Sequence, residues 1–130
     1  MARIVFCEDE ELIRKLMMVA MRSTDHTIEM TVNGRDCLVA IERELPELIV
    51  TDLAMPVMGG FALADAVHAR PDLRHIKIMF VTASVQRGDV ARFAEHGAAG
   101  YIGKPFSPRA LRTKIDEILA SSSVVPGPTV

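Results

Sequence analysis

The sequence lacks several features by which other classes of protein are recognised. It has only two cysteines, Cys7 and Cys37, without CxxC spacing, so we expect reduced thiols rather than a disulfide framework or a metal site. No apolar run approaches the ~20 residues of a membrane-spanning helix, and the N-terminus lacks the pattern of a signal peptide. The net charge of -2 gives no general attraction to nucleic acid or anionic lipid. These absences predict a cytoplasmic protein that binds neither nucleic acid nor membrane directly.

Length and composition favour one domain. A chain of 130 residues that is 49% hydrophobic can bury one core and is too short for two ordinary domains. We assign residues 1–120 to this domain, and no repeat divides them. Residues 121–130 contain two prolines and no hydrophobic periodicity, which predicts a disordered C-terminal tail or the start of a linker. If they begin a linker, the chain is a piece of a longer protein.

Five short apolar runs are predicted to be β-strands. Residues 3–7, 48–51 and 76–81 are nearly continuous in apolar side chains, as expected of strands that are covered on both faces. Residues 27–32 alternate between apolar and polar side chains, which is typical of an edge strand. The weakest run, 98–102, is predicted from its flanks, where Gly97 can end a helix and Lys104-Pro105 ends the strand.

Segments with helical spacing separate these runs. Residues 11–22 and 109–119 carry apolar side chains at the i, i+3/i+4, i+7 positions, and Ser107-Pro108 can begin the second of these helices. Weaker helices are predicted over residues 35–44, 60–69 and 89–96. Strict alternation of strand and helix favours right-handed crossovers and an α/β fold. We therefore predict a (βα)5, flavodoxin-like three-layer sandwich around a parallel five-stranded sheet of order 2-1-3-4-5.

Polar residues stand where four of the predicted strands end. Glu8-Asp9 follow the first strand, Asp52 the third, Thr82 the fourth and Lys104 the fifth. In an open parallel sheet, ligands bind beyond the carboxyl ends of the strands, so these side chains are expected to converge on one small volume. Three carboxylates, a hydroxyl and an ammonium gathered there suit a divalent cation and a phosphoryl group.

The chemistry of each side chain agrees with such a site. Mg²⁺ prefers oxygen ligands and is held by one or two carboxylates plus phosphate oxygens, which suits Asp9 and Asp52 with Glu8 in support. Beside a metal ion, the Asp52 carboxylate can act as a nucleophile toward phosphorus and form an aspartyl phosphate. Lys104 can pair with Asp52 before the reaction and with phosphate oxygens after it, and the Thr82 hydroxyl can donate to phosphate.

Each of these residues also has an ordinary structural interpretation. Acidic residues at the start of a helix stabilise its dipole, and this is the role expected of Glu10 and Glu11. Taken alone, Asp52 is typical of a turn and Lys104 of a solvated surface. Four histidines lie away from the predicted strand ends and are expected at the surface rather than in a phosphorelay: His26, His68, His75 and His96.

In their order and spacing, Glu8-Asp9, the Asp52-Leu-Ala-Met-Pro-Val-Met-Gly-Gly motif, Thr82-Ala83 and Lys104-Pro105 resemble a CheY-like receiver domain of a two-component response regulator. The resemblance runs from about residue 2 to residue 120. It implies that Asp52 accepts a phosphoryl group from a sensor histidine kinase or a histidine phosphotransfer protein. It also implies a protein that is not an enzyme in the usual sense, because it catalyses only its own phosphorylation and dephosphorylation.

The same resemblance implies a role for each site residue. Mg²⁺ would be the cofactor, and its ligands would be Glu8, Asp9, Asp52 and the backbone carbonyl of Ala54. Thr82 and Lys104 would bind the phosphoryl oxygens, Thr82 and Tyr101 would form the switch, and Lys104-Pro105 would be a cis peptide. Ala54 stands where many relatives carry a polar side chain, so the lifetime of the phosphoryl group is left open.

The resemblance further implies a partner surface. Phosphorylation would alter the face formed by the fourth helix, the fifth strand and the fifth helix, which would then bind a downstream protein target. Two alternatives to a stand-alone receiver remain open from the sequence. The chain could be a receiver excised from a larger DNA-binding response regulator or hybrid histidine kinase, or a Mg²⁺-dependent enzyme on the same fold, such as a phosphatase. The enzyme would need a substrate-pocket motif that the sequence does not offer.

Overall fold

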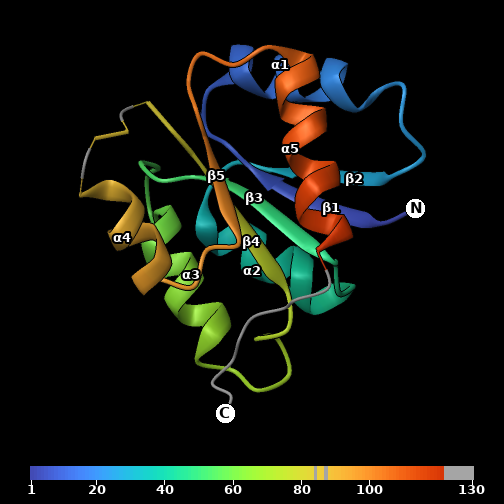
Figure 1. The fold of residues 1–130 in the computed structure, drawn as a ribbon. Coiled ribbons are helices and arrows are strands. Elements are labelled where there is room, and N and C mark those ends of the chain that lie inside the picture. The colour runs from blue at the N-terminus through green and yellow to red at the C-terminus, as the bar shows by residue number, and fades with distance from the viewer. Residues whose placement is uncertain (84, 87, 122–130) are drawn as a thin grey trace.

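A computed structural model describes residues 1–83, 85–86 and 88–121, in which strands and helices alternate along the chain (Figure 1). The strands form one sheet of order β2-β1-β3-β4-β5 with parallel neighbours, so the predicted topology is confirmed. The predicted tail falls on residues that, after Ser121, lie outside the described part. The elements are β1 (Arg3–Cys7), α1 (Glu11–Met21), β2 (Thr27–Thr31), α2 (Gly34–Arg43), β3 (Leu48–Asp52), α3 (Gly60–His68), β4 (Lys77–Thr82), α4 (Asp89–Glu95), β5 (Gly100–Gly103) and α5 (Pro108–Ala120).

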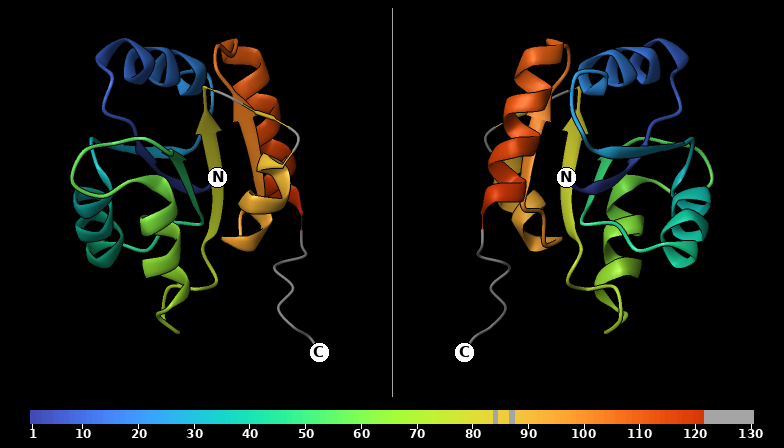
Figure 2. Two further views of the ribbon diagram at one scale, coloured as in Figure 1. Left: turned by 90° about the vertical axis from the view of Figure 1, so that its left-hand side faces the viewer. Right: turned by 90° about the vertical axis from the view of Figure 1, so that its right-hand side faces the viewer.

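The sheet forms the middle of three layers. Helices α1 and α5 cover one face, and α2, α3 and α4 cover the other (Figures 1 and 2). Successive residues of β1 therefore point into different cores: Ile4 and Phe6 pack with the α1 and α5 side, and Val5 packs with the α2 and α3 side. Burial on both faces explains why the central strands are almost continuously apolar. Within the described residues, no helix has the length and apolar composition needed to cross a bilayer.

Element boundaries differ from the prediction mainly at β5. The sequence pattern predicts a strand from Ala98, whereas β5 begins at Gly100. The backbone N–H of Ala98 donates to the carbonyl of Phe93 at 3.1 Å, because Gly97, with φ of 77°, turns the chain back against the end of α4. The helix terminus thus takes up a residue that propensity alone assigned to the strand.

The two cysteines are free and buried, as predicted. Cys7 ends β1 and its Sγ lies 3.3 Å from the Sδ of Met55, a residue of the loop after β3. Cys37 lies in α2 within the same apolar cluster. Both thiols therefore serve as small apolar side chains of the core.

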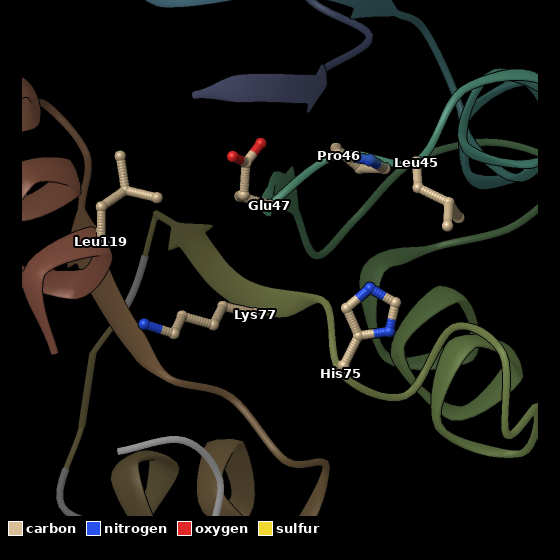
Figure 3. Close-up of a pocket in the computed structure, with 6 residues that line it drawn as sticks. All are labelled: Leu45, Pro46, Glu47, His75, Lys77 and Leu119. Carbon is tan, nitrogen blue, oxygen red and sulfur yellow. The ribbon is translucent and has the colours of Figure 1, made fainter. Parts of the chain in front are cut away.

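The amino-terminal edge of the sheet is held together by charged side chains that bind backbone groups. The Glu47 carboxylate accepts a hydrogen bond from the N–H of Arg3 at 2.8 Å, and Lys77 Nζ donates to the carbonyl of Ile118 at 2.9 Å and also to that of Ser121. Lys77 therefore caps the C-terminus of α5. Figure 3 shows the pocket of about 410 Å³ at this edge, lined by Leu45, Pro46, Glu47, His75, Lys77 and Leu119.

Candidate functional site

The strand order brings the predicted polar residues to one edge of the sheet. Asp52 and Thr82 are the last residues of β3 and β4. Each strand is therefore one residue longer at this end than the sequence predicts. Glu8 directly follows β1, the neighbour of β3, and Lys104 directly follows β5. The N–H of Lys104 donates to the carbonyl of Thr82 at 2.8 Å, which holds the end of β5 against β4. The predicted convergence at the carboxyl-terminal edge is therefore present.

Lys104 lies at the centre of the site. Its Nζ is 3.2 Å from Asp52 Oδ2, 3.2 Å from Glu8 Oε1 and 3.3 Å from Glu10 Oε1. Burial acts to lower the pKa of Lys104, but the carboxylates of Asp52 and Glu8 outweigh it, so the pKa is raised overall. Lys104 is therefore a permanent positive charge among three acids, with its side chain only 12% exposed.

Glu8 is a fully buried carboxyl group whose surroundings disfavour its ionised form. Burial, and then the charge of Asp52, raise its pKa to about 7, against the opposing effects of the Glu10 backbone N–H and of Lys104. Oε2 accepts a hydrogen bond from the Glu10 N–H at 3.1 Å. Oε1 is close to Lys104 Nζ, but this ion pair lacks hydrogen-bond geometry, so Oε1 finds no hydrogen-bond partner among the described residues. Its one close cation, Lys104, is shared with Asp52 and Glu10, so this buried oxygen is poorly compensated.

The backbone around Asp52 fixes its carboxylate. Oδ1 accepts a hydrogen bond from the N–H of Leu53 at 2.8 Å, and the Thr51 hydroxyl donates to the Asp52 carbonyl at 2.9 Å. The following loop then returns beneath the strand end, where the Gly60 N–H donates to the Leu53 carbonyl at 2.9 Å. A Cβ on Gly60 would lie 2.4 Å from the Asp52 carbonyl oxygen, so only glycine permits this close approach. The glycine of the motif thus holds the loop against the end of β3.

The same loop contains a residue in an unfavourable backbone conformation. Val57 has φ of 69°, in the left-handed region that a β-branched side chain rarely adopts. Its side chain is largely solvent-exposed. Strain of this kind is concentrated near functional sites, where the surrounding structure imposes it. Val57 lies five positions after Asp52, and no sequence pattern predicts its conformation.

Three carboxylates form a group that fits a divalent cation. Glu8, Glu10 and Asp52 each offer one oxygen, and these oxygens lie within 4.8 Å of one another. Carboxylate oxygens are the ligands that Mg²⁺ prefers, and the buried Glu8 oxygen still requires a partner. Asp9, a predicted ligand, is exposed and lies outside this group, and Ala54 is exposed in the loop after β3. Their roles as ligands stay predictions.

Glu10 is the residue that the sequence analysis missed. It was expected to stabilise the dipole of the following helix together with Glu11. Glu11 is exposed and pairs with Lys15 at 3.6 Å, four residues later in α1, as a helix-surface residue does. Glu10 instead lies 3.3 Å from Lys104. A usable signal was present, because only residues 8–10 connect β1 to α1, so all three lie at the strand end.

Tyr101 lies on the side of the sheet that faces α4. It is half-buried in β5, and its ring centroid is 5.4 Å from that of Phe93 in α4. Phe93 in turn lies 5.6 Å from Phe80 in β4, two residues before Thr82. Aromatic contacts therefore connect the end of β4 to α4 and β5. The predicted cis peptide between Lys104 and Pro105 is confirmed.

The four histidines lie away from this edge of the sheet. His26 Nδ1 accepts a hydrogen bond from the N–H of Ala2 at 3.0 Å, and His96 Nδ1 lies 2.7 Å from the Asp65 carboxylate. The prediction of surface positions agrees with His75, which is exposed, whereas three histidines are half-buried at the surface: His26, His68 and His96.

Comparison with known proteins gives a consistent result. A family described as the response regulator receiver domain matches residues 4–116. The chain is 30% identical over 117 residues to the chemotaxis protein CheY of Pseudomonas aeruginosa, which covers 89% of this chain and 94% of CheY. It is 27% identical over 124 residues to the response regulator PleD of Caulobacter vibrioides, covering 95% of this chain. The chain spans only 27% of the length of PleD.

A solved structure extends the likeness to three dimensions. The signal receiver domain of a signal transduction histidine kinase from Syntrophus aciditrophicus superposes with a TM-score of 0.84 at 28% sequence identity. The superposition covers 100% of this chain and 98% of that domain. The likeness therefore includes the whole sheet and all of the helices that carry the polar edge.

Proposed function

This chain belongs to the response regulator receiver family, and from that premise we propose that Asp52 is its phosphoryl acceptor. Phosphorylation of an aspartate in two-component signalling is the role of this family, whose members are signalling proteins rather than conventional enzymes. One observation carries the assignment. Asp52 is a buried carboxylate at the end of a central strand, 3.2 Å from the Lys104 ammonium and beside the buried acid Glu8.

The proposed reaction is a transfer from nitrogen to oxygen. An Asp52 carboxylate oxygen attacks the phosphorus of a phosphohistidine on a sensor histidine kinase or histidine phosphotransfer protein. The new O–P bond forms as the P–N bond breaks, and the histidine nitrogen leaves with the electron pair. Hydrolysis of the resulting acyl phosphate returns the carboxylate. The chain would thus catalyse its own phosphorylation and dephosphorylation and no other reaction.

The acidic residues would hold the cofactor of this step. We assign Mg²⁺ to Glu8 and Asp52, together with Asp9 and the backbone carbonyl of Ala54. When bound, Mg²⁺ would offset the repulsion between the Asp52 carboxylate and an anionic phosphoryl group. Asp9 and Ala54 are both exposed, so a hydrated ion would have access to them.

Lys104 and Thr82 would stabilise the phosphorylated form. The Lys104 ammonium, which now pairs with Asp52, would bind phosphoryl oxygens once the carboxylate has reacted. The Thr82 hydroxyl would donate to another phosphoryl oxygen and, with Tyr101, change the surface formed by α4, β5 and α5. The ring contact between Tyr101 and Phe93 of α4 supports this route. A downstream protein target would read the changed surface.

The proposed receiver spans residues 1–120 and is placed in the cytoplasm, where its kinase would act. The assignment of Asp52 is the same whether the chain works alone, as the coverage of CheY suggests, or within a longer protein, as the coverage of PleD suggests. A DNA-binding regulator and a hybrid kinase are the two longer proteins that the sequence leaves open. All of the proposed site residues lie between Glu8 and Lys104. The site is therefore complete within the receiver in either setting.

Intact mass spectrometry tests the proposal. After incubation with acetyl phosphate and Mg²⁺, we expect one added phosphoryl group that hydroxylamine removes, as expected of an acyl phosphate. Asp52→Asn and EDTA should each abolish the adduct, whereas Asp25→Asn, the same change at an exposed aspartate, should not. An equal adduct on Asp52→Asn would contradict the assignment. So would the absence of both an adduct and beryllofluoride binding in the folded, Mg²⁺-loaded protein.

A further inference from the structure

The Glu10 carboxylate turns away from the helix that it precedes. Glu10 is the N-cap residue of α1, with φ of -90° and ψ of 123°, but its side chain makes no capping hydrogen bond. Its Oε1 lies instead 3.3 Å from the Nζ of Lys104, a residue 94 positions later in the chain. The carboxylate is thus oriented into the acidic site rather than over the start of its own helix.

The site contains more carboxylates than positive charges among the described residues. One ammonium, that of Lys104, lies within 3.3 Å of three carboxylates. In addition, Glu8 Oε1 is buried and has no hydrogen-bond partner among the described residues, and its one ionic contact is with the shared Lys104. A divalent cation would supply both the missing charge and the missing partner, because carboxylate oxygens of this kind are its ordinary ligands.

We propose that Glu10 is a further cation-facing carboxylate of this site, in addition to Glu8, Asp52 and the proposed ligand Asp9. The cation would lie among the three oxygens that now surround the Lys104 ammonium, since those oxygens are within 4.8 Å of one another. Glu10 is the exposed member, so it reaches the ion from the mouth of the site, directly or through a water of its hydration shell. This inference rests on the proposed function in that it adds a residue to the Mg²⁺ site of a receiver.

Cation binding at Glu10 would also affect Lys104, which contacts the same carboxylate. A cation and an ammonium compete for the same oxygens, so cation binding would free Lys104 from all three acids together. The ammonium would then be available to phosphoryl oxygens at Asp52. Glu10 thus connects occupation of the metal site to the release of the residue that binds phosphate.

A matched pair of variants separates this role from general charge effects. Glu10→Gln keeps the size of the side chain and removes its charge. Glu11→Gln makes the same change one residue later, where the carboxylate pairs with Lys15 and points to solvent. Both variants remove one negative charge from the start of α1 and from the whole chain. A difference between them therefore reports contact with the ion and not the helix dipole or the net charge.

Calorimetric titration of the full chain with MgCl₂ alone measures the effect. We expect Glu10→Gln to weaken Mg²⁺ binding about tenfold, as the loss of one nearby charge predicts, and Glu11→Gln to weaken it less than about twofold. As a second readout, Mn²⁺ should broaden the NMR amide signal of residue 10 in the wild type far more than that of Lys15. Equal Mg²⁺ affinities of the two variants would overturn the inference.

Phosphorylation of the wild type, followed separately by intact mass, keeps this inference distinct from the proposed function. A wild type that binds Mg²⁺ through Glu10 but takes neither a phosphoryl group nor beryllofluoride would support the inference and overturn the function. If the wild type is phosphorylated on Asp52 but Glu10→Gln leaves the Mg²⁺ affinity unchanged, only the inference is overturned.

Discussion

At the amino-terminal edge of the sheet, charged side chains bind backbone groups or pair with one opposite charge or two, whereas at the carboxyl-terminal edge three carboxylates share a single ammonium. Lys77 donates to two carbonyls at the end of α5, and Glu47 accepts from the N–H of Arg3. At the opposite edge, one ammonium serves three carboxylates, and a buried oxygen of Glu8 has no hydrogen-bond partner among the described residues. The same residue types thus connect elements at one edge and form a binding site at the other.

The charged groups at the two edges contribute differently to the free energy of unfolding. A charge that replaces its water contacts with good hydrogen bonds stabilises the fold, whereas a buried charge without enough partners destabilises it. Neutralising Lys77 at the amino-terminal edge and Glu8 at the carboxyl-terminal edge should therefore have opposite effects on the free energy of unfolding. The first change should lower it, and the second should raise it. Proteins accept such a loss of stability where a site must bind a ligand.

The largest effect is expected for Glu8→Gln in the absence of Mg²⁺. The folded pKa of Glu8 is raised to about 7 from 4.5, so its favourable contribution is complete below about pH 4.5 and is lost as the pH rises through about 7. Gln resembles the protonated form at every pH. The variant should therefore be more stable than the wild type by about 2–3 kcal/mol near pH 8. Urea unfolding monitored by circular dichroism measures the difference.

The pH dependence provides the control for this prediction. Below about pH 4.5, Glu8 is protonated in both the folded and unfolded states, so variant and wild type should have similar free energies of unfolding. Saturating Mg²⁺ should also narrow the gap near pH 8, because the ion stabilises the ionised wild type. A gap that stays constant across this range would show that Glu8 is not the titrating group.

A smaller effect of opposite sign is expected at the other edge. Lys77→Met keeps the apolar stem of the side chain but removes the hydrogen bonds to the carbonyls of Ile118 and Ser121. The free energy of unfolding should fall by about 1–2 kcal/mol, as expected for the loss of hydrogen bonds from a charged donor. The yield of phosphorylated protein from acetyl phosphate should not change. If the variant is as stable as the wild type, Lys77 does not stabilise the fold, and the proposed difference between the two edges is wrong.

The smallest effect is expected at Val57. Val57→Asn replaces a β-branched residue at φ of 69° with one that tolerates the left-handed region, so the free energy of unfolding should rise by about 1 kcal/mol. Val39→Asn is the matched control, because Val39 is also exposed but lies inside helix α2. Urea unfolding of both variants tests the difference. Equal changes in the two would mean that the backbone of Val57 stores no strain that matters.

Much of the fold and part of the site could be predicted from the sequence. Apolar runs that stop at Asp52 and Lys104 define both the strands and the edge on which their polar neighbours meet. Glu10 could not be placed in this way, because its orientation depends on a contact with a residue 94 positions away. The φ of Val57 escaped prediction for a similar reason, since the close return of Gly60 beneath Asp52 determines the path of the loop.

The central claim is that the carboxyl-terminal edge is the phosphoryl and Mg²⁺ site, while the amino-terminal edge is structural. A two-dimensional NMR titration of the wild type with beryllofluoride and Mg²⁺ tests this directly. The account predicts large changes in the amide signals of Glu10, Leu53 and Lys104, with those of Glu47 and Lys77 almost unmoved. Changes centred on Glu47 and Lys77, or no change at Leu53, would contradict it.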